Sequence, residues 1–178
     1  SLLALPAPGL SLAEKRAINK SLLRSGATIG EINCVRKHLS AIKGGRLARA
    51  AMPARLITYA ISDVPGDDPS VIASGPTVPD PTTSRQAQEV LAKYHIDITP
   101  GVARWLASEQ AETLKSGDPA FRSSEFHIIG TPAGSIEAAA EAARKAGVEV
   151  RSLGADVEGE ARDVAAGHAA MALAASAD

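Results

Sequence analysis

The sequence predicts an α/β fold with a parallel sheet, of the Rossmann-like αβα sandwich type. Two short apolar runs, residues 55–62 and 126–130, contain β-branched residues and are typical of strands buried on both faces. Segments with helical spacing lie before, between and after these runs. Because strands and helices alternate along the chain, right-handed crossovers and a parallel sheet are favoured.

Capping residues place the first helices. Ser11 and Glu14 form one capping box, and Thr28 with Glu31 forms a second. Gly147 suits the end of a later helix, for which Ser135 is the expected cap. The helices expected in chain order are residues 12–24, 28–38, 84–94, 100–116, 135–146 and 158–175.

Two further segments complete the expected fold. Residues 148–153 predict a third strand. Residues 63–83 hold five prolines and predict a long loop directly after the first strand. Long ordered loops inside compact domains tend to be functional.

Composition excludes several classes of partner. The 178 residues carry 19 Lys and Arg against 20 Asp and Glu, and only 3% are aromatic, so we expect no nucleic-acid binding and no membrane association. No apolar run is long enough to span a bilayer. The single cysteine, Cys34, cannot form an internal disulfide and fits a reducing, cytoplasmic location. The chain lacks an initiator Met and looks like a fragment, residues 1–178, of something longer.

The first candidate site is the acidic loop at the end of the first strand. Asp63 and Asp67 are carboxylates that can hold Mg²⁺ or take a proton from a hydroxyl. Further along the loop, hydroxyl, glycine and carboxylate groups could line a pocket: Ser74, Gly75, Thr77 and Asp80. The alternative is a surface loop in which Asp and Ser form turns.

The second candidate is the basic segment at residues 36–46. Gly44 and Gly45 allow backbone amides to approach an anion, and Lys43 adds a charge beside them. Arg36 and Lys37 are supporting cations, although a solvated basic helix end explains them equally well. The turn at residues 130–135 lacks a phosphate-binding fingerprint, and the four histidines show no metal-binding spacing.

Three segments resemble the glycerate 2-kinase family with a C-terminal leucine-rich domain, some of whose members are named hydroxypyruvate reductases. They are residues 2–9, residues 36–48, and residues 61–68 continued by 73–80. The resemblance implies transfer of the γ-phosphoryl group of ATP to the 2-hydroxyl of D-glycerate with Mg²⁺. It also implies that the chain is part of the N-terminal α/β domain, that the C-terminal domain is absent, and that the fragment alone is inactive.

Within that resemblance, Lys43, Asp63 and Asp67 are the expected catalytic groups, with Asp67 the metal ligand. Phosphoryl transfer depends mainly on positioning and charge neutralisation, which these residue types can supply. The expected binding residues are Arg36, Lys37, Gly44, Gly45, Ser74, Gly75, Thr77 and Asp80. The alternatives are an NAD(P)H-dependent hydroxypyruvate reductase, disfavoured by the lack of a dinucleotide glycine fingerprint, and a non-catalytic fragment. The sequence does not decide whether the protein forms a homodimer.

Overall fold

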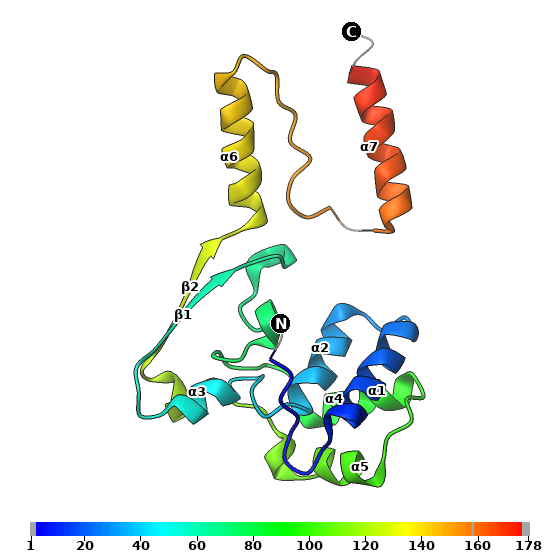
Figure 1. The fold of residues 1–178 in the computed structure, drawn as a ribbon, viewed down its shortest axis with the longest axis vertical. Coiled ribbons are helices and arrows are strands. Elements are labelled where there is room, and N and C mark those ends of the chain that lie inside the picture. Colours follow the sequence, from blue (N-terminus) through cyan, green and yellow to red (C-terminus); the bar gives the residue numbers. More distant parts are fainter. Residues whose placement is uncertain (1–2, 158, 176–178) are drawn as a thin grey trace. The chain divides into compact units, whose positions relative to one another are not determined.

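The computed structural model describes residues 3–157 and 159–175. The chain divides into two compact units, Ser1–Ile129 and Gly130–Asp178. The helices and strands are α1 (Leu12–Arg24), α2 (Ile29–His38), α3 (Arg46–Ala51), β1 (Leu56–Ile61), α4 (Ser84–Lys93), α5 (Pro100–Leu106), β2 (Ser124–Gly130), α6 (Pro132–Lys145) and α7 (Ala161–Ala175) (Figure 1). None of the described helices is long and apolar enough to cross a membrane.

Both predicted capping boxes are present. The Ser11 hydroxyl accepts from the amide of Glu14, whose carboxylate accepts from the Ser11 amide at 2.8 Å. Thr28 and Glu31 pair in the same way at the start of α2. These reciprocal bonds satisfy amides that have no partner inside the helix, which explains why α1 and α2 begin where the sequence predicts.

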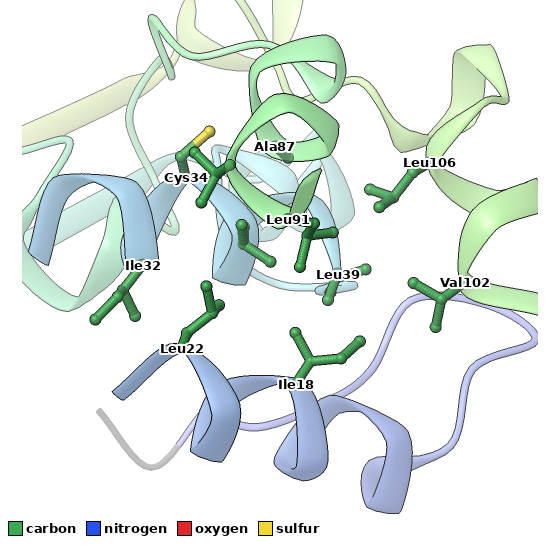
Figure 2. Packing of buried hydrophobic residues seen from close by; sticks show 11 residues of the cluster. Ile18, Leu22, Ile32, Cys34, Leu39, Ala87, Leu91, Val102 and Leu106 are labelled. Atoms are coloured by element: carbon green, nitrogen blue, oxygen red, sulfur yellow. The ribbon is translucent and has the colours of Figure 1, made fainter. Parts of the chain in front are cut away.

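The main core of the first unit is helical. Buried apolar side chains from α1, α2, α4 and α5 pack together, as Figure 2 shows. Leu22 and Val35 are each 1% exposed within this cluster. Cys34 is buried there, as predicted, and the Trp105 ring packs against the cluster while its indole N–H donates to the carbonyl of His38 at 2.7 Å. This core holds α1 and α2, which carry several of the basic side chains.

The sheet is small. β1 and β2 are neighbouring strands that run in the same direction (Figure 1), so the predicted mixed α/β class with a parallel sheet is confirmed. The predicted third strand at residues 148–153 is wrong. The amide of Val148 donates instead to the carbonyl of Ala143, closing the end of α6, and the Val148 side chain is exposed. An extended segment without a neighbouring strand has no partner for its backbone groups.

Several helix boundaries also differ from the prediction. The last helix, expected over 158–175, begins at Ala161, and residue 158 lies outside the described residues. The helix expected over 100–116 ends at Leu106, because the Ser108 hydroxyl competes for the carbonyl of Trp105 at 2.7 Å. In the second unit, Thr131 rather than Ser135 caps α6: its hydroxyl accepts from the Gly134 amide at 3.0 Å.

The Arg46 guanidinium holds the segment that follows α5. It donates to the carbonyls of Gln110, Ala111 and Glu112 at 3.3, 2.7 and 3.2 Å. It also donates to the carbonyl of Lys37 at 2.9 Å. Carbonyls satisfied in this way need no helical partner, so residues 109–111 form only a short 3₁₀ turn.

Candidate functional site

The basic segment and the acidic loop meet through consecutive hydrogen bonds. Ala73, Ser74 and Gly75 all have positive φ, at 53°, 64° and 55°. Their three carbonyls accept, in order, from the Lys43 ammonium at 2.7 Å, the Gly44 amide at 3.2 Å and the Gly45 amide at 2.8 Å. Left-handed backbone is costly for Ala73 and Ser74, so it persists only where the surroundings hold it. Residues 43–45 therefore clamp a strained turn in the acidic loop.

This clamp gives the two glycines a role different from the one expected. Because the Gly44 and Gly45 amides are already bound to carbonyls, they are not free donors for an anion. Gly45 has φ +79°, and an added Cβ would lie 2.9 Å from the Leu114 Cβ and 3.1 Å from the Val78 carbonyl oxygen. The positions require glycine for close packing.

A pair of alanine substitutions separates crowding from backbone strain. Gly26 has the same φ of +79° but nothing within 4 Å of an added Cβ. We expect Gly26→Ala to lower the free energy of unfolding by about 1–2 kcal/mol, the ordinary cost of left-handed alanine. Gly45→Ala should cost about 2 kcal/mol more, because it also overpacks the site. Urea unfolding followed by Trp105 fluorescence measures both, and equal losses would contradict the clamp.

A cavity of about 510 Å³ opens beside the clamp, entirely within the first unit. Its polar lining comes from three places: α1, α2 with the basic segment after it, and the acidic loop. The charged or polar residues that line it are Lys15, Arg16, Asn19, Asn33, Arg36, Lys43, Asp63 and Ser74. We refer to this space as the basic cavity, because four of these side chains are cationic and one is acidic.

Among the residues that the structure describes, the cations of the basic cavity lack acidic partners. Within residues 3–157 and 159–175, none of Lys15, Arg36 and Lys43 forms a salt bridge; Arg36 donates to the Asn19 side-chain oxygen at 2.6 Å. Lys43 is only 7% exposed. Burial, with the charge of Arg36 nearby, lowers the pKa of Lys43. Unpaired cations gathered around one cavity favour an anionic ligand.

Lys15 shares this environment. Its ammonium donates to the carbonyls of Ala4 and Leu5 at 3.4 and 3.3 Å. Burial, then repulsion from Lys43, Arg36 and Arg46, lowers the pKa of Lys15 to about 8. An anion in the cavity would relieve this repulsion and favour the charged form of Lys15.

Two expected site residues lie in the interior instead of lining the cavity. Lys37 and Asp80 form an ion pair at 2.7 Å, and they are 3% and 1% exposed. Burial raises the pKa of Asp80, but hydrogen bonds from Lys37 and Thr82 outweigh it and lower the pKa overall. The pair ties α2 to the end of the acidic loop and so fixes the walls of the site.

The remaining expected residues divide between cavity and scaffold. Asp63 and Ser74 line the cavity, and the Ser74 hydroxyl donates to the Asn33 side-chain oxygen at 3.3 Å. Thr77 accepts from the Thr58 hydroxyl at 2.9 Å and is buried. Asp67, with φ +52°, is not among the lining residues.

The acidic loop was also the expected place for a metal. One carboxylate oxygen of Asp67 is buried and has no hydrogen-bond partner among the described residues, which fits a group that could bind a cation. The described residues contain no cluster of three acidic, histidine or cysteine side chains. Mg²⁺ in phosphate-transfer sites is commonly held by one or two carboxylates together with substrate phosphates, so this sparse donor set fits that mode of binding.

Sequence reasoning missed several residues that the structure brings to the site, among them Arg16 and Asn19 on α1. Lys15 and Asn33 line the cavity, and Arg46 orders the segment behind it. Lys15 lies on α1, where a lysine is indistinguishable from a solvated helix residue. Only the high number of cations that converge on the cavity singles it out.

The fold and site define a mixed α/β protein in which a strained loop and a basic segment border a cavity lined by cationic side chains. Residues 1–107 match the family described as "Domain of unknown function (DUF4147)". The chain belongs to this family.

Named relatives agree with the resemblance to glycerate 2-kinases. The chain is 53% identical over 175 residues to a "Putative hydroxypyruvate reductase" of Agrobacterium vitis, covering 98% of this chain and 39% of the relative. It is 40% identical over 163 residues to a D-glycerate 2-kinase of Thermotoga maritima, covering 92% and 37%. The crystal structure of a Thermotoga maritima glycerate kinase matches with a TM-score of 0.70 and 43% identity, over 80% of this chain and 33% of that one. The chain thus spans about two fifths of these sequence relatives.

Proposed function

We propose that the full-length protein containing this chain is an ATP-dependent D-glycerate 2-kinase. The observation that carries the proposal is the basic cavity, which is lined by Asp63 and by Lys43 and Arg36, neither of which has an acidic partner among the described residues. The 40% identity to a D-glycerate 2-kinase and the structural match to a glycerate kinase support it. ATP use and the free, buried Cys34 support a cytoplasmic location.

The residues suit an in-line phosphoryl transfer. The 2-hydroxyl oxygen of D-glycerate forms a bond to the γ-phosphorus while the bond from that phosphorus to the β–γ bridging oxygen breaks, and ADP leaves with the bridging oxygen. Asp63 accepts the hydroxyl proton, and Lys43 and Arg36 neutralise charge on the phosphoryl oxygens. Asp67 would hold Mg²⁺, which supplies further charge neutralisation when bound.

The second candidate function is an NAD(P)H-dependent hydroxypyruvate reductase. The name of the Agrobacterium vitis relative favours it. The sequence contains no Gly-x-Gly-x-x-Gly fingerprint for a dinucleotide pyrophosphate, and the kinase names of other relatives point the other way.

A product assay on the full-length protein distinguishes the two functions. With ATP, Mg²⁺ and D-glycerate we expect 2-phosphoglycerate and ADP in equal amounts, with the phosphate located by NMR. With NADH and hydroxypyruvate we expect no loss of absorbance at 340 nm. Phosphate on carbon 3, or NADH oxidation without phosphorylation, would refute the proposal.

A further inference from the structure

We infer that the basic cavity binds the phosphate chain of a nucleoside triphosphate, rather than the carboxylate of glycerate, and that Lys15 is a binding residue of this site. The inference rests on the proposed function and assigns one of its two substrates to a place in this chain. It follows from the charge, the lining and the size of the cavity.

The charge of the cavity exceeds what glycerate can neutralise. Lys15, Arg36 and Lys43 line it without acidic partners in the described part of the chain, and Arg16 is a fourth cation among the lining residues. Asp63 is the one carboxylate among the lining residues. Glycerate brings a single negative charge, whereas a triphosphate brings several, spread over a chain of oxygens that can contact several cations at once.

The walls of the cavity suit the rest of a nucleotide. Apolar side chains from the start of the chain, both helices and the acidic loop complete the lining: Leu3, Leu12, Ile29, Val64 and Val71. About 510 Å³ lies within the range of cavities that hold molecules of drug-like size and far exceeds the needs of a three-carbon acid. A nucleoside has an apolar base and sugar that such walls can cover.

Lys15 is poised to respond to a polyanion. The other charged residues that line the cavity with it are Arg16 on the same helix, Arg36 and Lys43 on the neighbouring segments and Asp63 on the loop, and the described lining residues include neither histidine nor cysteine. Burial and the neighbouring cations lower the pKa of Lys15 to about 8, so part of it is neutral near pH 8. A bound phosphate chain raises this pKa, so binding at pH 8 takes up protons from solution.

Calorimetric titration of the full-length protein tests the inference with sodium tripolyphosphate, ATP and D-glycerate as separate ligands. Lys15→Gln removes the charge under test. Lys20→Gln is the matched control, because Lys20 lies exposed on the same helix and does not line the cavity. Titrations at pH 8 in two buffers of different ionisation enthalpy give the number of protons taken up.

We expect one tripolyphosphate and one ATP to bind competitively, with ATP tighter because of the apolar walls. Lys15→Gln should weaken both about tenfold or more and abolish the proton uptake, and Lys20→Gln should change affinity less than twofold. Absence of tripolyphosphate binding, equal losses in the two variants, or displacement of tripolyphosphate by D-glycerate would overturn the inference. Equal affinity for tripolyphosphate and ATP would overturn its assignment to a nucleotide.

The outcomes separate this inference from the proposed function. If the full-length protein phosphorylates glycerate but its Lys15→Gln variant binds tripolyphosphate as tightly as the parent does, the proposed function stands and the inference fails. If ATP competes with tripolyphosphate and its binding depends on Lys15, but the protein phosphorylates no glycerate, the inference stands and the proposed function fails.

Discussion

Asp80→Ala is expected to lower the free energy of unfolding by about 3–5 kcal/mol, because it leaves the Lys37 ammonium buried without its counter-charge. The two side chains are 2.7 Å apart and almost completely buried, so water cannot replace the lost carboxylate. Asp80 also accepts from the Thr82 amide at 2.9 Å, and this bond to the acidic loop disappears as well. Urea unfolding followed by the fluorescence of Trp105, the single tryptophan, measures the loss.

Two further variants show whether the buried charge is the cause. Glu89→Ala breaks an exposed ion pair with Arg85 on α4 and should cost less than about 0.5 kcal/mol. In the double variant Lys37→Met with Asp80→Ala neither charge of this pair remains, so the double variant should be more stable than Asp80→Ala alone. A double variant as unstable as the single one would show that Asp80 acts through packing or its bond to Thr82.

The elements that the sequence predicted correctly are specified by neighbours in the chain. Ser11 with Glu14 and Thr28 with Glu31 are three residues apart, so the start of each helix can be recognised from a short window. Local pattern also indicated β1 and β2. It failed at residues 148–153, where an alternating apolar pattern is present but the Val148 amide is already used by the end of α6.

The contacts that build the site join residues that lie much farther apart in the sequence. Lys37 pairs with Asp80 across 43 positions, and Lys43 reaches the carbonyl of Ala73 across 30. The sequence identified the basic segment and the acidic loop as candidate sites from their charged residues and glycines. The structure shows that the two segments are in contact. Whether a cation binds a ligand, a buried carboxylate or a carbonyl depends on three-dimensional packing, so the sequence could not separate the cavity residue Arg36 from its interior neighbour Lys37.

The second large effect is expected for Lys43→Met in the full-length protein. Methionine keeps most of the buried stem of the side chain but removes the cavity charge and the donor to the Ala73 carbonyl. If Lys43 neutralises the phosphoryl group, kcat/KM for glycerate phosphorylation should fall about 100- to 1000-fold, as for the loss of other preorganised charge-stabilising donors. Steady-state kinetics at pH 7 measures this, with Lys20→Met as the control that removes an exposed lysine from α1.

The division between kcat and KM in Lys43→Met shows how the residue acts. A loss mainly in kcat, with the urea midpoint close to that of the parent, means that Lys43 stabilises the charge that develops during transfer. If the loss of rate disappears at saturating ATP, Lys43 contributes equally to binding of the ground state and of the transition state. A rate within about twofold of the parent contradicts both, since a buried ammonium that contacts a transferring phosphoryl group cannot be removed at so small a cost. Lys43 would then serve only to clamp the left-handed turn at residues 73–75, and the anion would depend on Arg36 and Lys15.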